Sequence, residues 1–206
     1  MRLYFVRHGE SEANTTGLFS NRPPGAALTA AGREQAESLA VRLHDAGITQ
    51  IYSSPLLRAR QTAEILSAAL NAPVEVTDAL REYDMGIYEG TKDPVGWEAN
   101  RTLFMAWTIQ KQWNQRVPEG ESMNDMRRRF EPFVNDLVDA HRDSDSQVAL
   151  VGHGGLYLAL LPMMLSNVRY RWALAHPFGN ADVAVVEPDG SELVCLSWCG
   201  LEPGAE

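Results

Sequence analysis

Residues 3–10 read LYFVRHGE, an apolar run that stops abruptly at Arg7, His8 and Gly9. The apolar side chains are typical of a buried β-strand, which we expect over residues 2–6. A strand of this kind has no need to end in a cation and an imidazole. We therefore expect the end of this first strand to take part in a functional site.

Strand and helix patterns alternate through the rest of the chain. Strands are expected over residues 2–6, 48–52, 74–76, 147–151, 181–187 and 193–198, and helices over residues 28–46, from residue 54 onward, 123–141 and 155–165. Strands that alternate with helices form largely parallel sheets with helices on both faces. The sequence therefore predicts an α/β fold, a three-layer sandwich with a mostly parallel central sheet.

Local signals mark where two of these helices begin. Thr29 is suited to be the N-cap of the helix over residues 28–46, and Gly47 to end it. Ser54 and Pro55 are predicted to be the N-cap and the first residue of the next helix.

Residues 83–122 depart from the alternating pattern and hold three of the five tryptophans. We interpret them as a small helical cap inserted into a single domain that covers residues 1–206. Packing is the commoner role for such tryptophans. If they line a pocket instead, they indicate a substrate with an apolar or ring portion.

Composition and charge argue against several classes of protein. The net charge of −9 disfavours a nucleic-acid partner or a membrane-surface protein. The first apolar run is too short for a signal peptide, and residues 148–165 contain His153 and Pro162, which makes them a poor membrane span. Cys195 and Cys199 would lie about 13 Å apart on one strand, too far for a disulfide. We expect a reduced, cytoplasmic protein, and leave its oligomeric state open, with a dimer as one option.

The expected topology brings four polar side chains to one edge of the sheet. Ligands of such sheets bind beyond the carboxyl ends of the strands. Arg7 and His8 follow the first strand. Arg58 lies in the first turn after the second strand, and His153 follows the strand over residues 147–151. We therefore expect them to meet, although they are far apart in the sequence.

Two arginines and two histidines at one edge are typical of an anion-binding site. We expect the anion to be a phosphoryl group. A guanidinium presents forked donors that match phosphate oxygens. No P-loop, HExxH or metal-spaced carboxylate cluster occurs, so we expect neither metal nor cofactor. One imidazole can attack phosphorus and form a phosphohistidine that water later hydrolyses, and flanking arginines favour the neutral form that attacks. The leaving alkoxide needs a proton, for which Glu82, Asp84 and Glu89 are candidates.

Six sequence blocks, in this order and spacing, resemble the signatures of the histidine phosphatase superfamily, also called phosphoglycerate mutase-like. They are RHGESEAN at 7–14, LTAAGREQA at 28–36, IYSSPLLRARQTAEIL at 51–66, LREYDMGIYEG at 80–90, VPEGES at 117–122 and VGHGG at 151–155. The resemblance covers most of the chain, and it implies a mostly parallel sheet between helices and metal-independent chemistry.

The resemblance also implies roles for individual residues. His8 matches the nucleophile and Glu82 the proton donor. The matching phosphate clamp consists of Arg7, Arg58 and His153. Three further residues, Asn14, Ser20 and Gly154, match positions that contact phosphate or substrate or that adjoin the second histidine.

Two departures favour a phosphatase over a mutase. Cofactor-dependent mutases of the family carry a tyrosine three residues after the acid, where this chain has Met85. They also carry a lysine further along, and Lys92 is displaced from that position by one residue. We expect a metal-independent phosphomonoesterase of the histidine acid phosphatase type, acting on a small phosphorylated metabolite. A mutase-type phosphotransferase and a non-catalytic phosphate-binding module remain as alternatives. The sequence does not identify the substrate.

Overall fold

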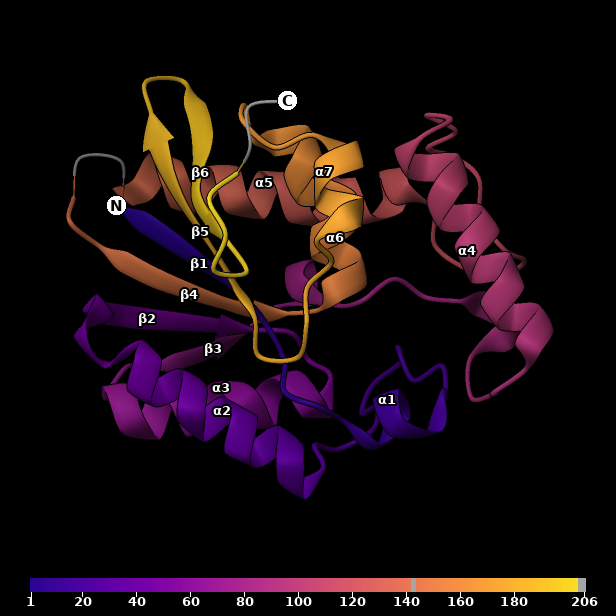
Figure 1. The fold of residues 1–206 in the computed structure, drawn as a ribbon, viewed down its shortest axis with the longest axis horizontal. Helices are drawn as coiled ribbons and strands as arrows, with labels where there is room; N and C mark the ends of the chain where they lie inside the picture. Colours follow the sequence, from indigo (N-terminus) through magenta and orange to yellow (C-terminus); the bar gives the residue numbers. More distant parts are fainter. Residues whose placement is uncertain (142–143, 204–206) are drawn as a thin grey trace.

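The computed structural model describes residues 1–141 and 144–203, and one six-stranded sheet runs through it (Figure 1). Its strand order is β3-β2-β4-β1-β5-β6. The strands are β1 (Arg2–Arg7), β2 (Ile48–Ser53), β3 (Val74–Val76), β4 (Gln147–Gly152), β5 (Val183–Asp189) and β6 (Glu192–Trp198). Strands β1 to β4 pair in parallel, whereas β5 and β6 join antiparallel. The predicted α/β fold with a mostly parallel sheet is confirmed, with an antiparallel hairpin at one edge.

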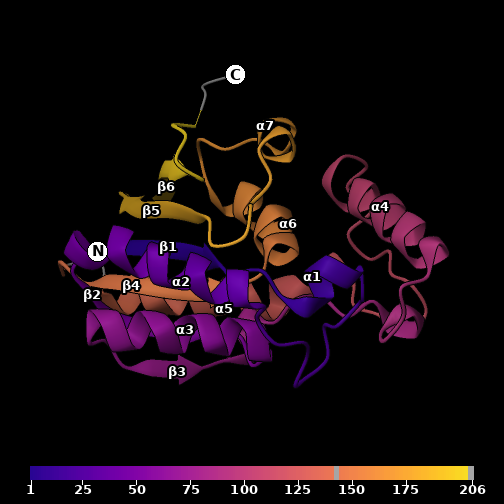
Figure 2. The same cartoon turned by 60° about the horizontal axis from the view of Figure 1, so that its bottom comes forward.

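Helices cover both faces of this sheet (Figure 2). The helices are α1 (Glu12–Thr16), α2 (Ala30–Arg42), α3 (Leu57–Leu70), α4 (Pro94–Thr108), α5 (Met123–His141), α6 (Gly154–Met164) and α7 (Tyr170–Ala175), with short 3₁₀ turns at His44–Ala46, Asp78–Leu80 and Gly86–Tyr88. Helices α2 and α3 pack on one face, and α5 and α6 pack on the other.

The two-residue period of β1 explains why two cores form. Leu3 and Phe5 point into the core shared with α5 and α6, whereas Tyr4 and Val6 point into the core shared with α2 and α3. Successive side chains of a strand alternate between faces, so an uninterrupted apolar strand can be buried on both sides. The apolar run that opens the sequence is therefore a central strand.

The start of α3 differs from the sequence prediction, whereas the start of α2 agrees with it. Thr29 is the N-cap of α2, and its side chain accepts a hydrogen bond from the Gly32 backbone N–H. Helix α3 begins at Leu57 with Leu56 as N-cap, so the prediction that Ser54 is the N-cap was wrong. Ser54 precedes the helix, where its Oγ accepts from the Leu56 backbone N–H and lies 2.8 Å from Nε2 of His153.

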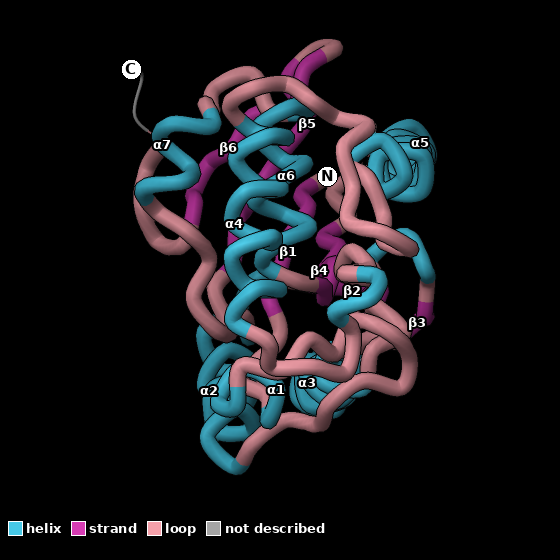
Figure 3. Tube along the Cα trace, turned by 90° about the vertical axis from the view of Figure 1, so that its right-hand side faces the viewer, coloured by secondary structure: helices cyan, strands magenta, loops and turns pink. Residues whose placement is uncertain are grey.

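Residues 83–122 contain the helix α4 and connecting loops, and the division into a domain and a cap stays a prediction. Figure 3 shows α4 in front of the carboxyl ends of the parallel strands. Trp107 is fully buried and packs edge-on against Tyr83, as expected for a packing tryptophan. Trp97 is 37% exposed and stacks on Phe19.

Both cysteines are free thiols, as predicted, but Cys199 lies just beyond the end of β6, so the predicted separation along one strand does not apply. None of the helices within residues 1–141 and 144–203 combines the length and the apolar character needed to cross a bilayer.

Replacing Phe130 with alanine tests the core between α5 and the sheet. Phe130 is fully buried between Phe5 and Tyr157, so the Phe130→Ala change leaves a cavity and should reduce the free energy of unfolding by about 3–5 kcal/mol. Urea denaturation followed by circular dichroism measures the loss. Val41→Ala, at a position 78% exposed on α2, should change stability by less than about 0.5 kcal/mol. Equal stability of the two variants would contradict this assignment of the core.

Candidate active site

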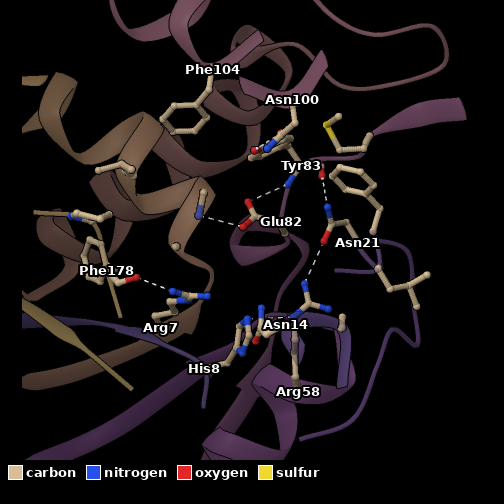
Figure 4. A pocket seen from close by; sticks show the side chains of 18 of the residues that line it. Arg7, His8, Asn14, Asn21, Arg58, Glu82, Tyr83, Asn100, Phe104 and Phe178 are labelled. Carbon is tan, nitrogen blue, oxygen red and sulfur yellow. Dashed lines mark hydrogen bonds between the residues drawn. The ribbon is translucent and has the colours of Figure 1, made fainter. Parts of the chain in front are cut away.

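Three of the four side chains expected at one edge of the sheet, Arg7, His8 and Arg58, line a cavity of about 370 Å³ (Figure 4), whereas His153 is fully buried beside His8 and is not part of the cavity wall. Arg7, His8, Arg58, Glu82 and Gly154 all line it. The register explains part of this convergence, because β1 and β4 are parallel neighbours with Arg7 opposite Gly152. The residues that follow these two strands therefore begin at the same level.

His8 is buried, and its two ring nitrogens have different partners. Nδ1 lies 2.6 Å from the carbonyl oxygen of Gly9, which can only accept, so Nδ1 carries the proton. The lone pair is then on Nε2, where it accepts a hydrogen bond from Arg58 Nε at 3.0 Å. Burial lowers the pKa of His8 well below its usual value, and the charges of Arg58 and Arg7 lower it further. The imidazole is therefore neutral near pH 7, with a basic nitrogen facing the guanidinium.

Arg58 is fixed by three groups at once. Besides the bond to His8, its Nη1 donates to the Ser20 carbonyl at 2.6 Å and its Nη2 to Asn21 Oδ1 at 3.1 Å. Burial lowers the pKa of Arg58 to about 10, so the guanidinium remains charged at neutral pH. It sits in the first turn of α3, as the sequence predicts.

Arg7 is the second guanidinium of the cavity. Its Nη1 donates to the carbonyl of Phe178 at 2.5 Å, whereas its buried Nε has no hydrogen-bond partner among the described residues. A Cβ added to Gly154 would lie 3.1 Å from Cδ of Arg7, so the glycine lets the start of α6 approach this side chain closely.

His153 lies next to His8, with the two ring centroids 5.1 Å apart. The Ser54 hydroxyl accepts from the Leu56 backbone N–H and lies 2.8 Å from His153 Nε2, to which it can donate. When the hydroxyl donates, the ring proton is on Nδ1, and when His153 Nε2–H donates to Ser54, Nδ1 is an acceptor; in both tautomers Nδ1 is a buried atom without a partner in the described part of the chain. Burial lowers the pKa of His153 well below its usual value, with a further contribution from Arg58.

Glu82 supplies the carboxylate of the cavity. Oε2 accepts from the Gly155 backbone N–H at 3.0 Å and Oε1 accepts from its neighbour Tyr83 at 3.2 Å. Burial raises the pKa of Glu82, although Arg58 and the two backbone N–H groups oppose this shift. A Cβ on Gly155 would come within 2.8 Å of Oε2, so glycine is required for this contact.

The two competing carboxylates of the same segment have other partners. Asp84 accepts from Arg22 Nε at 2.7 Å and from the Gly86 backbone N–H. Glu89 accepts from the backbone N–H groups of Asn21 and Met85. Neither Asp84 nor Glu89 lines the cavity, which leaves Glu82 as its acidic side chain.

Asn14 and Ser20 differ in their placement. Asn14 lines the cavity, and its Oδ1 accepts from the Ser11 backbone N–H and from Asn180 Nδ2. Ser20 does not line the cavity; its hydroxyl accepts from the Ala26 backbone N–H, and its carbonyl holds Arg58. A role for the Ser20 side chain toward substrate stays a prediction.

Sequence reasoning missed three residues that shape the site. Ser54 orients His153, and its position after a strand, like that of His8, was a signal that could have revealed it. Asn21 orients Arg58, and the carbonyl of Phe178 orients Arg7, but no sequence pattern marks either. Within residues 1–141 and 144–203, no three His, Cys, Asp or Glu side chains are grouped so that they could hold a metal ion.

A family model and individual known proteins both match most of the chain. The family described as "Histidine phosphatase superfamily (branch 1)" matches residues 3–200. A protein of Hydrogenobacter thermophilus named "Putative phosphoserine phosphatase 2" is 34% identical over 199 residues, which cover 95% of each chain. A protein of Proteus mirabilis named "Probable phosphoglycerate mutase GpmB" is 33% identical, covering 82% of this chain and 77% of its own.

Solved structures of related enzymes superimpose on nearly the whole chain. A mycobacterial glucosyl-3-phosphoglycerate phosphatase in complex with VO3 has a TM-score of 0.77 at 27% identity and covers 96% of this chain and 98% of its own. The α-ribazole phosphatase of Shigella flexneri has the same TM-score, 0.77, at 25% identity and covers all of both chains.

The neutral state of the two buried histidines can be measured directly. Because the pKa of each is lowered, His8 and His153 should keep the ¹⁵N shifts of neutral imidazole at pH 5.5, where free histidine, with a pKa of about 6.5, is mostly protonated. The unfolded chain then binds more protons than the folded one, so these two groups reduce folding stability as the pH falls below about 6.5.

An Arg58→Met change should raise the pKa of His8, since a neighbouring positive charge is removed. Arg60→Met, at the exposed arginine two residues further along α3, should leave the His8 signal unchanged. Since the chain has five histidines, the signals must first be assigned, and titration near pH 6.5 of those assigned to His8 and His153 in the wild type would refute this account of the site.

Proposed function

Because the chain belongs to branch 1 of the histidine phosphatase superfamily, we propose that it is a phosphomonoesterase that works through a phosphohistidine on His8, without a metal ion. The observation that carries the proposal is the neutral, buried imidazole of His8, whose lone pair on Nε2 accepts from Arg58, with the charge of Arg7 also acting on the ring. Phosphoryl transfer is catalysed mainly by positioning and charge stabilisation, and this arrangement supplies both.

The unsatisfied donors of the site favour a bound PO₃ group. Three buried side-chain polar atoms lack partners among the described residues, and two of them, Arg7 Nε and His153 Nδ1, belong to this cluster. A buried donor without an acceptor costs free energy. Phosphate oxygens can accept from Arg7 Nε, from His153 Nδ1 in the tautomer that carries the proton there, and from the second N–H of each Arg58 Nη. We propose that Arg7, Arg58, His153 and Asn14 hold the phosphate.

The first step forms a bond between His8 Nε2 and phosphorus. The Arg58 Nε–H that occupies the lone pair turns to a phosphate oxygen, so the nucleophile is released as the substrate binds. As the N–P bond forms, the bond between phosphorus and the ester oxygen breaks. The Nδ1–H donated to the Gly9 carbonyl stabilises the positive charge that develops on the ring.

Glu82 is proposed as the proton donor for the leaving alkoxide. Burial already raises its pKa, and a phosphate dianion alongside would raise it further. In the second step the Glu82 carboxylate takes a proton from water, the oxygen of that water bonds to phosphorus, and the N–P bond breaks. Inorganic phosphate leaves, and neutral His8 is regenerated.

A mutase-type phosphotransferase is the competing candidate, because several relatives carry a phosphoglycerate mutase name. It requires a phosphoenzyme that outlives product release. Met85, where mutases of the family carry tyrosine, is fully buried at the cavity wall and offers no hydroxyl. Interconversion of 2- and 3-phosphoglycerate faster than release of phosphate would establish the mutase and reject the phosphatase.

The role of His8 is tested by phosphate release from p-nitrophenyl phosphate. His8→Ala should reduce kcat by on the order of 10³-fold or more, as removal of other enzyme nucleophiles does. Wild-type protein quenched in the steady state should carry an acid-labile phosphoryl group that the variant lacks. His44→Ala, at an exposed position outside the cavity, serves as the control. Inhibition by EDTA, or full activity of His8→Ala, would disprove the proposal.

The role of Glu82 is tested with two leaving groups. An alkyl alkoxide needs a proton, whereas p-nitrophenolate leaves without one. Glu82→Gln should therefore reduce kcat on an alkyl phosphate by about 10²–10⁴-fold and on p-nitrophenyl phosphate far less. Asp84→Asn, in the neighbouring carboxylate outside the cavity, should affect both substrates equally. Equal losses for both substrates in Glu82→Gln would contradict the assignment of the general acid.

A further inference from the structure

The cavity that contains His8 has two chemically different ends (Figure 4). Its charged side chains, Arg7, Arg58 and Glu82, all belong to the end at which we propose the phosphate to bind. Among the described residues that line the cavity there is no other lysine, arginine, aspartate or glutamate. The remainder of the wall therefore carries no charge with which to recognise a second ionised group.

The uncharged part of the wall is mostly apolar and aromatic. It includes Leu18, Trp97, Phe104 and Leu158, whereas Phe178 lies beside Arg7 (Figure 4). A volume of about 370 Å³ is near the lower end for small-molecule sites, so the cavity suits a phosphate together with one group of about the size of a ring. Burial of such a group against these side chains is favourable at roughly 25 cal/mol per Å² of apolar surface.

The polar groups of this outer part are neutral amides. Asn100 Oδ1 accepts from the Tyr83 hydroxyl at 2.8 Å, which leaves its amide nitrogen as a neutral donor at the cavity. The Asn21 amide is already engaged, since its Oδ1 accepts from Arg58 and its Nδ2 donates to the Tyr83 carbonyl. A hydroxyl or a carbonyl of a ligand can use Asn100, but a carboxylate finds no cation.

Trp97 holds the outer wall in place. Its ring stacks on Phe19 with centroids 4.4 Å apart, and its Nε1 donates to the Gly17 carbonyl at 2.8 Å. These two contacts fix α4 against the loop that follows α1. The aromatic surface is therefore preorganised, which lowers the entropic cost of binding an apolar group.

We infer that the site selects phosphate monoesters of uncharged alcohols that carry an apolar or aromatic group, and discriminates against esters whose alcohol part bears its own carboxylate. The inference rests on the proposed phosphatase function and adds the substrate class. A second carboxylate would lose its hydration against an aromatic wall without a compensating cation, and the one charged side chain among the described lining residues besides Arg7 and Arg58 is the acidic Glu82. This preference differs from the acidic substrates in the names of several relatives.

Three alkyl esters provide the test. Glycerol 3-phosphate and 3-phosphoglycerate differ only by a neutral CH₂OH in place of a carboxylate, and 2-phenylethyl phosphate adds a ring. We expect kcat/KM to be highest for the phenylethyl ester and at least about tenfold lower for 3-phosphoglycerate than for glycerol 3-phosphate. A kcat/KM for 3-phosphoglycerate equal to or above that of glycerol 3-phosphate would overturn the inference.

Two variants locate the preference in the outer wall. Trp97→Ala should reduce kcat/KM for phenylethyl phosphate by about tenfold while changing that for glycerol 3-phosphate less than about twofold, whereas Trp97→Phe should retain most of the preference. Asn100→Lys adds a cation and should improve 3-phosphoglycerate relative to glycerol 3-phosphate. An unchanged inhibition constant for inorganic phosphate shows that each variant is folded at the catalytic end. Unchanged substrate ratios in both Trp97→Ala and Asn100→Lys would reject the role of this wall.

Failure of the inference can be told apart from failure of the proposed function. If no ester is turned over and no phosphohistidine forms, the phosphatase proposal fails. The dissociation constants of the same three esters, measured by calorimetry on the wild-type chain, then still decide the substrate class. Tighter binding of the phenylethyl ester than of 3-phosphoglycerate supports the inference, and the reverse order overturns it.

Discussion

The hydrogen bond from Arg58 Nε to His8 Nε2 is the interaction on which the rest of the site depends. It joins the end of β1 to the first turn of α3, and the other nitrogens of Arg58 hold the loop at residues 20 and 21. The same contact helps to keep the buried imidazole neutral, since a positive ring beside a positive guanidinium would be repelled. Position, protonation state and loop conformation are therefore set by one pair of side chains.

The sheet topology explains why such a pair can form from distant parts of the chain. Strand β1 lies between β4 and β5, and β4 also pairs with β2. The segments that follow β1, β2 and β4 therefore lie beside one another at the carboxyl ends of the strands, which is where α/β sheets bind ligands. His8, Ser54 and His153 come from these three segments, and each is the first residue after its strand.

The sequence predicted the sheet with helices on both faces and the placement of Arg7, His8, Arg58 and His153, because periodicity and strand ends are local features, whereas only the family resemblance singled out Glu82 among three carboxylates. Local signals were also the source of the error at Ser54, whose position before Pro55 is typical of an N-cap although its hydroxyl serves His153. The carbonyl of Phe178 and the amide of Asn21 could not be predicted, since their roles depend on loop conformations that only the folded chain sets. For the tryptophans of residues 83–122 the sequence left two roles open, packing and lining a pocket, so it predicted the outer wall of the cavity only as an alternative.

Residues near the end of the sequence complete the site to which Arg7 and His8 belong. Arg7 is held by the carbonyl of Phe178, and Asn180 reaches both the His8 carbonyl and Asn14. During synthesis on the ribosome, the segments that carry His8 and Arg58 emerge early, whereas Phe178 and Asn180 emerge only after most of the chain has been translated. A nascent chain therefore acquires a complete anion pocket late, once β1 has been enclosed between strands made long after it.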